Sequence, residues 1–170
     1  LDEADLKQHY QVPIENSWVY AAKEKGLPIV SPGAEDSTLG NMFTARVMDG
    51  TVKSHAALKS GTAQLELLTN WYRKESQAAP IGFFQIGGGI AGDFAICAVP
   101  MLIQDLREDA NLWSYFAQIS DAVTSYGGYS GAVPNEKITW TKLSKESPKF
   151  MIQSDATIVA PLIFAYVLGQ

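Results

Sequence analysis

The sequence predicts an α/β fold with a doubly wound, mostly parallel sheet and helices on both faces. Short apolar segments of strand length alternate along the chain with longer segments of helix length, a pattern typical of parallel sheets. Near-continuous apolar runs such as residues 83–86 suit strands that are buried on both faces. Because 170 residues can bury a sizeable core, we expect one α/β domain over residues 1–170.

The expected elements follow this alternation. Strands are predicted at 27–31, 81–86, 112–119 and 149–153, and helices at 63–74, 91–107 and 157–168. Pro100 lies inside the second helix and should kink or interrupt it, because proline lacks an amide N–H. Residues 125–135 are rich in Gly, Ser and Pro and are expected to form one long loop, and long loops in compact domains are often functional.

The composition excludes several classes of protein. The net charge is −5 and the basic residues are scattered, which argues against a nucleic-acid surface. No apolar run reaches the length of a membrane span, and no signal peptide is expected. Cys97 is the single cysteine, which suits a reducing, cytoplasmic location, and we expect it to be a buried, inert thiol. With His9 and His55 it gives no zinc spacing.

Two strand–helix junctions and one glycine-rich run are candidates for ligand binding. Gly87-x-Gly89-x-x-Gly92 matches a dinucleotide fingerprint, since glycines let the backbone approach a pyrophosphate, but it also suits an ordinary tight turn. Asp36 and Asp155 each follow a predicted strand, where α/β sheets place ligand groups. Both aspartates could instead cap the helices that come next.

A carboxylate, an indole and an amine lie close together in Glu136-Lys-Ile-Thr-Trp140-Thr-Lys142. A Trp face attracts cations, a Glu can bind a cation or move a proton, and a desolvated Lys can attack an imine. If this segment is extended, Trp140 and Lys142 share one face. The alternative is an edge strand with a packed Trp and a solvated surface Lys.

Four segments, in order, resemble the deoxyhypusine synthase family: residues 29–40, 86–90, 130–142 and 154–162. The third reads Ser130-Gly-Ala-Val-Pro-Asn-Glu136, with Trp140 and Lys142 at the family's spacing. The resemblance implies a Rossmann-like, NAD-binding fold, of which this chain is the C-terminal part. It also implies NAD as cofactor, a polyamine as small-molecule partner and self-association as a homotetramer.

The resemblance assigns roles to individual residues. Lys142 corresponds to the imine-forming lysine, and Glu136 and Trp140 to contacts of the polyamine. The implied NAD contacts, with a weaker match at the pair that follows the third predicted strand, are Asp36, Gly87, Gly88, Gly89, Asp121, Ala122, Asp155 and Ala156.

Three positions depart from the family pattern and are expected to alter the substrate wall. Asn41 replaces an aspartate, Asp93 stands where the family has a histidine, and Tyr129 replaces another aspartate. A cationic amine still suits the pocket, but spermidine in the family's usual pose does not follow.

The sequence therefore favours an NAD-dependent aminobutyl transferase that acts through a lysine imine. The acceptor is either a small amine, giving a homospermidine-type product, or a protein lysine. The alternatives are a non-catalytic NAD-binding paralogue that supports a partner subunit, and an ordinary NAD-dependent dehydrogenase, which leaves Lys142 without a role.

Overall fold

The computed structural model describes residue 11 and residues 13–170, which form parts of two compact units, Leu1–Val30 and Ser31–Gln170. In the first unit, a 3-10 turn at Ile14–Asn16 precedes helix α2 (Trp18–Glu24), and the hydroxyl of Ser17 caps that helix. The strand–helix alternation on which the single-domain prediction depends lies in the second unit.

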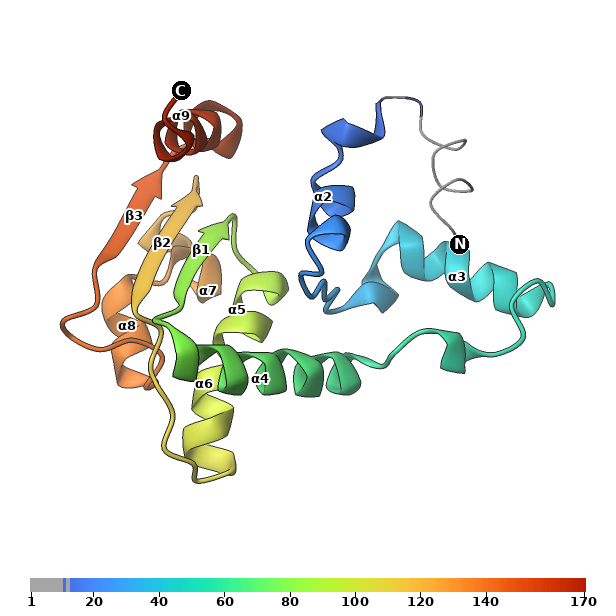
Figure 1. Ribbon diagram of the computed structural model, residues 1–170, viewed down its shortest axis with the longest axis horizontal. Coiled ribbons are helices and arrows are strands. Elements are labelled where there is room, and N and C mark those ends of the chain that lie inside the picture. The colour runs from blue at the N-terminus through green and yellow to red at the C-terminus, as the bar shows by residue number, and fades with distance from the viewer. Residues whose placement is uncertain (1–10, 12) are drawn as a thin grey trace. The chain divides into compact units, whose positions relative to one another are not determined.

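A three-stranded parallel sheet forms the centre of the second unit (Figure 1). Its strands are β1 (Gly82–Ile86), β2 (Tyr115–Ser120) and β3 (Lys149–Gln153), in the order β1-β2-β3. Phe83 pairs with Phe116 and Phe116 with Lys149, so these side chains share one face. The parallel α/β arrangement and three of the four predicted strands are confirmed.

The predicted strand at 27–31 is wrong, because these residues form no strand in the structure. Leu27 and Ile29 are about half exposed, at 53% and 55%. A strand is stabilised by a neighbouring strand that takes up its N–H and C=O groups, and apolar composition alone does not supply that neighbour.

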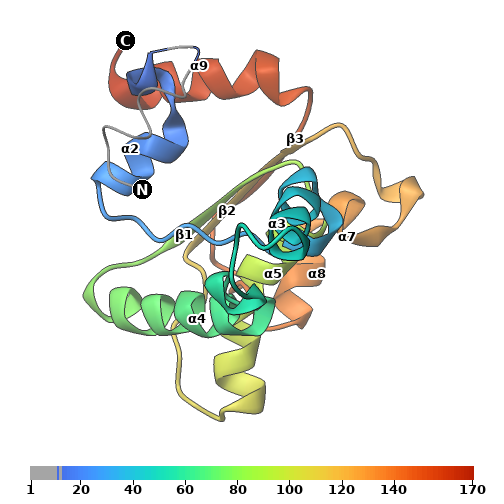
Figure 2. The same cartoon turned by 90° about the vertical axis from the view of Figure 1, so that its right-hand side faces the viewer.

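Helices precede, connect and follow the strands of the second unit, and those from α4 to α9 lie beside the sheet (Figures 1 and 2). Their bounds are α3 (Thr38–Met48), α4 (Gly61–Ala78), α5 (Ile90–Ile96), α6 (Ala98–Pro100), α7 (Gly128–Gly131), α8 (Pro134–Thr139) and α9 (Ala156–Leu168). In the described part of the chain, no helix combines the length and apolarity needed to cross a bilayer.

The two faces of the sheet are covered unequally, which modifies the doubly wound prediction. Right-handed crossovers between strands that follow one another in a single direction place both connections on the same face. The Phe83 and Phe116 face accordingly packs against α4 to α6 and α8. On the other face Phe84 contacts Phe164 of α9, with ring centroids 5.8 Å apart.

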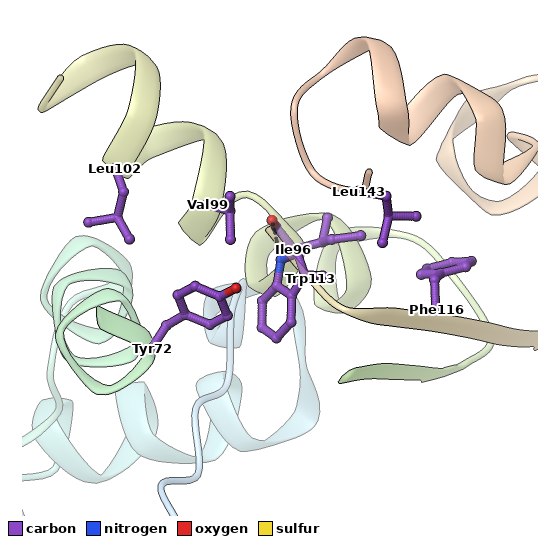
Figure 3. Close-up of a cluster of buried hydrophobic side chains, with 7 residues drawn as sticks. All are labelled: Tyr72, Ile96, Val99, Leu102, Trp113, Phe116 and Leu143. Atoms are coloured by element: carbon purple, nitrogen blue, oxygen red, sulfur yellow. Dashed lines mark hydrogen bonds between the residues drawn. The ribbon is translucent and has the colours of Figure 1, made fainter. Parts of the chain in front are cut away.

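The core lies between the covered face, α4 and the helices that follow β1 (Figure 3). Pro100 has no N–H to offer the carbonyl of Ile96, and the Trp113 indole donates to that carbonyl instead, at 3.1 Å. The helix predicted at 91–107 is consequently broken into α5, α6 and a π-helical turn at Met101–Asp105. The predicted interruption at Pro100 is confirmed.

The segment from 124 to 142 is more structured than the sequence predicted. It contains a 3-10 turn at Thr124–Tyr126 followed by α7 and α8, so a single long loop at 125–135 is wrong. The extended backbone expected at Trp140 and Lys142 is also wrong. Trp140 ends α8, and Thr141 has a left-handed φ of 55°.

Candidate functional site

A cavity of about 480 Å³ lies beside α5, α7 and α8 on the helix-covered side of the sheet. Its wall combines carboxylates, aromatic rings, a thiol and an amine with small residues. The lining residues are Asp93, Cys97, Thr124, Gly127, Gly128, Tyr129, Gly131, Ala132, Val133, Glu136, Trp140 and Lys142. Five of the six residues predicted to be catalytic or substrate-binding are therefore brought together.

Lys142 is the buried amine of this cavity. Only 8% of its side chain is exposed, and its Nζ donates to Oδ1 of Asp93 at 3.0 Å. Its backbone is held on both sides, because the Lys142 N–H donates to the Lys137 carbonyl and the Trp113 N–H donates to the Lys142 carbonyl. The prediction of a solvated surface lysine is therefore excluded, and Lys142 has the burial expected of a reactive amine.

Asp93 and Cys97 lie one turn apart at α5, and both reach the cavity. The Cys97 thiol donates to Oδ1 of Asp93 at 3.4 Å, so Asp93 accepts from a thiol and an amine together. Burial, more than any nearby charge, raises the pKa of Cys97, which keeps the thiol in its less nucleophilic form. The raised pKa agrees with the predicted inert thiol, but Cys97 is only partly buried, and its place in the site was not anticipated.

Tyr129 connects the cavity to the glycine-rich loop. Its hydroxyl donates to Oε1 of Gln85 at 2.8 Å, and Gln85 Nε2 in turn donates to the Gly87 carbonyl at 2.8 Å. Burial, followed by the charges of Asp93 and Cys97, raises the pKa of Tyr129, so its hydroxyl stays a hydrogen-bond donor. Gln118 adds a second connection, donating to the Gly87 and Ser130 carbonyls at 3.0 Å each.

Glu136 and Trp140 form the open side of the cavity. Both are exposed, Trp140 by 55%, and both line the cavity with Lys142. They come together because α8 ends at Trp140 and the turn at Thr141 redirects the chain. Trp140 and Lys142 are thus close together, as predicted, but a helix end and a turn bring them together instead of an extended strand.

Lys137 is a functional candidate that sequence reasoning missed. It is only 2% exposed, and its Nζ lies over the rings of Phe116 and Tyr129, at 4.8 and 4.9 Å from their centroids. The same Nζ donates to the Ala132 carbonyl at 3.2 Å. A lysine in a short polar helix ordinarily faces solvent, so no signal in the sequence marks this one.

The triple glycine follows β1 directly. Gly87 and Gly89 have φ of 79° and 71°, and a Cβ at either would meet nothing within 4 Å, so the backbone there faces open space. At Gly88 a Cβ would lie 2.6 Å from Cβ of Ser130. Close packing against Ser130 therefore explains Gly88, and a Gly88→Val substitution would disturb that contact as well as any ligand.

The other predicted cofactor residues lie at strand ends or beside the glycine loop. Asp121 and Ala122 follow β2. Asp155 follows β3 and also caps α9, where Oδ1 accepts from the Thr157 N–H at 2.8 Å. The carboxyl ends of parallel strands meet at one edge, so these residues and the triple glycine share that edge.

Asp36 ends a 3-10 turn at Ala34–Asp36, and Ser37, rather than Asp36, caps α3. This turn approaches the glycine loop through Gly33, where a Cβ would meet Cδ1 of Ile90 at 2.9 Å. The backbone at Gly87 and Gly89, where a Cβ would meet nothing within 4 Å, leaves room for the close approach of a pyrophosphate.

Asn41 lies on α3, is exposed and does not line the 480 Å³ cavity. Asn41 is therefore the one predicted substrate-binding residue that does not line this cavity. Among the described residues, which exclude His9, no His, Cys, Asp and Glu side chains group in a way that could hold a metal ion.

The fold and site define a class: a parallel α/β protein with a glycine loop at the sheet edge and a buried lysine in a cavity lined by carboxylates and aromatic rings. The sequence profile of the family described as Deoxyhypusine synthase matches residues 6–167. The chain belongs to this family, whose members are generally transferases that act on polyamine donors.

Named relatives agree with this assignment. A deoxyhypusine synthase-like protein of Nostoc punctiforme is 30% identical over 163 residues, which is 94% of this chain and 41% of that protein. A probable deoxyhypusine synthase 1 of Archaeoglobus fulgidus is 27% identical over 163 residues, 94% of this chain and 47% of that protein. The chain thus spans less than half the length of these relatives.

Proposed function

We propose that the protein transfers an aminobutyl group between amines with NAD as cofactor, through an imine on Lys142. The single observation that carries the proposal is the buried Lys142 amine, 3.0 Å from Asp93 in a cavity that also exposes Trp140 and Glu136. A desolvated lysine beside a carboxylate can give up its proton locally and then act as a nucleophile.

The charges of the cavity favour a cationic amine as donor. Asp93 and Glu136 provide carboxylates, and the exposed Trp140 ring can hold an ammonium by its face. The aspartates of the family pattern are replaced at Asn41 and Tyr129, and the Tyr129 hydroxyl is already bonded to Gln85. We therefore expect a donor preference that differs from the family's usual handling of spermidine.

NAD, when bound, would accept hydride from the carbon beside the donor nitrogen and return it to the product. The open backbone at Gly87 and Gly89 would hold this cofactor, together with Asp36 on the turn that Gly33 brings close to Ile90. Asp121, Ala122, Asp155 and Ala156 would complete the binding edge at the ends of β2 and β3.

The residues of the chain then exchange one amine for another. Asp93 accepts a proton from Lys142, whose free amine forms a C–N bond to the imine carbon of the oxidised donor. The bond from that carbon to the donor's own imine nitrogen then breaks, and this nitrogen takes up the lysine's protons and leaves as an amine, while the aminobutyl carbon stays double-bonded to Lys142. The acceptor amine next attacks the Lys142 imine, and Lys142 leaves with a proton. Glu136 and Trp140 hold the cationic ends of donor and acceptor during both exchanges.

The acceptor is a small amine or a protein lysine, and the two give distinct products. A putrescine acceptor gives homospermidine, while a protein acceptor carries the aminobutyl group on a lysine. We place this activity in the full-length protein, in the cytoplasm and in a homotetramer, as the family resemblance implies.

Borohydride trapping tests the proposal. The full-length protein is incubated with NAD and a panel of amines that includes spermidine, then reduced during turnover, digested and examined by mass spectrometry. We expect an aminobutyl adduct on the peptide that carries Lys142, and loss of transfer by more than 100-fold in Lys142→Arg, as removal of a covalent nucleophile implies.

Lys74→Arg is the matched control, because Lys74 lies on α4 with 82% of its side chain exposed. It should keep both adduct and rate. Transfer without an adduct at Lys142 would overturn the assigned nucleophile. NAD binding with neither transfer nor adduct would favour the non-catalytic paralogue.

A further inference from the structure

The amine of Lys137 occupies an enclosure behind the cavity wall. The faces of Phe116 and Tyr129 lie at 4.8 and 4.9 Å, and the Ala132 carbonyl accepts at 3.2 Å. Ring faces and a carbonyl oxygen all favour the charged form of an amine. This enclosure therefore offsets part of the cost of burying a charge in a residue that is 2% exposed.

Lys142 lies near the same aromatic ring. Its Nζ is 5.6 Å from the centroid of the Tyr129 ring, close to which Lys137 also lies. Burial lowers the pKa of Lys137, and the positive charge of Lys142 lowers it further, while Glu136 and Asp93 oppose the shift. Two positively charged amines that lie near one ring repel each other.

Only one of these lysines can meet a substrate. Lys142 lines the cavity, whereas Lys137 does not. The charged and titratable groups around the pair are Asp93 and Cys97 at α5, Tyr129 on α7 and Glu136 on α8. Asp93 is hydrogen-bonded to Lys142, whereas the Lys137 amine donates to the Ala132 carbonyl, so Lys142 is the member of the pair that has a bonded carboxylate.

We propose that Lys137 is a positioning residue that acts by its charge: its ammonium, held between Phe116 and Tyr129, disfavours a second ammonium at Lys142 and so increases the share of Lys142 present as free amine. This inference rests on the proposed function, because the imine mechanism requires Lys142 to react as a free amine. It explains why a short helix turns a lysine inward beside another lysine.

Competitive labelling of amines tests this without any cofactor or turnover. The full-length protein is treated at a series of pH values with a limiting amine-acylating reagent, and the modification of Lys142 is quantified by mass spectrometry. In Lys137→Met, which fills the enclosure without a charge, we expect half-labelling of Lys142 to move up by about one pH unit. Labelling at neutral pH should then fall about tenfold.

Two further variants separate charge from packing. Lys137→Arg keeps the charge and should leave the labelling curve near its original position. Lys74→Met changes an exposed lysine far along α4 and should not move it. Circular dichroism and thermal unfolding show whether each variant folds. If Lys137→Met fails to fold, Lys137→Gln provides the same uncharged comparison.

The outcomes distinguish this inference from the proposed function. A Lys142 labelling curve that is unchanged in a folded Lys137→Met or Lys137→Gln protein overturns the role of Lys137 while leaving Lys142 as the nucleophile. A normal shift in labelling with no borohydride adduct at Lys142 supports the charge coupling and contradicts the imine mechanism.

Discussion

At the scale of single residues, the site depends on charges that are buried together. Lys142 has Asp93 as a bonded partner at 3.0 Å, whereas the Lys137 amine has two ring faces and one carbonyl. Burying a charge without an opposite charge is costly, because water is replaced by weaker partners. Burial of Lys137 is therefore expected to lower the free energy of unfolding.

This cost should appear in the pH dependence of unfolding. Burial lowers the pKa of Lys137 below the 10.5 of a free lysine. At pH values between the pKa of folded Lys137 and 10.5, Lys137 is protonated in the unfolded chain and deprotonated in the folded one. The free energy of unfolding therefore rises with pH over this range, by up to about 1.4 kcal/mol per pH unit. Lys137→Met should remove this rise, as measured by urea unfolding at several pH values.

The measurements should stay below pH 9.0, because Cys97 and Tyr129 have raised pKa values and contribute with the opposite sign above 9.0 and 10.0, respectively. Lys74→Met serves as the control and should keep the slope of the unmodified protein. If the free energy of unfolding changed equally with pH in the unmodified protein and in Lys137→Met, burial of Lys137 would not be the cause of the rise.

At the scale of elements, one proline explains how β1 is connected to β2. Pro100 leaves the Ile96 carbonyl without an N–H partner from its own helix, and the indole of Trp113 takes that place. Trp113 is also packed against Tyr72 and Phe83, with ring centroids 4.4 and 5.1 Å away. The broken helix is thus tied to the segment before β2 by a hydrogen bond and by ring contacts.

Substitutions at these two positions should be coupled. Trp113→Phe leaves the Ile96 carbonyl unpaired, and we expect the free energy of unfolding to fall by about 1–3 kcal/mol for that bond, in addition to lost packing. In a Pro100→Ala background a helical N–H becomes available, so the same substitution should cost less. Urea unfolding of the two single variants and the double variant measures the difference. If the losses in free energy of unfolding for the two single variants simply added in the double variant, the indole would not be replacing the N–H that Pro100 lacks.

At the scale of the whole molecule, the proposed cofactor edge is assembled from segments far apart in the sequence. The ends of β1, β2 and β3 bring residues 87–89, 121–122 and 155–156 to one edge, and the contact of Gly33 with Ile90 brings the Asp36 turn towards it. Each segment alone is an ordinary turn or cap. Because the strands are parallel, the segments that follow them all lie at the same edge of the sheet.

Asp36 offers the clearest test of this edge, since Ser37 already caps α3. Asp36→Asn keeps the shape of the side chain and removes its charge, and we expect NAD to bind the full-length protein about tenfold more weakly, in line with the loss of one charged hydrogen bond. Isothermal titration calorimetry provides the measurement. Asp49→Asn, on the exposed C-cap of α3, should bind NAD normally. Equal affinities in the two variants would remove Asp36 from the proposed site.

The sequence by itself determined the α/β class, three parallel strands and the break at Pro100, and it singled out Glu136, Trp140 and Lys142, which line one cavity. These follow from local causes: apolar periodicity, the missing N–H of proline and a motif whose spacing is read along the chain. Asp93 and Tyr129 were also identified there, as departures from the family pattern, and the cavity contains both.

Only the tertiary structure decided what depends on distant partners. Residues 27–31 have the composition of a strand but no strand beside them, and the side chains of Lys137 and Cys97 face the site through packing that no local pattern encodes. The same holds for Gly88, whose requirement comes from Ser130, 42 positions along the chain. Burial and charge coupling are sums over neighbours in space, and a sequence records only neighbours along the chain.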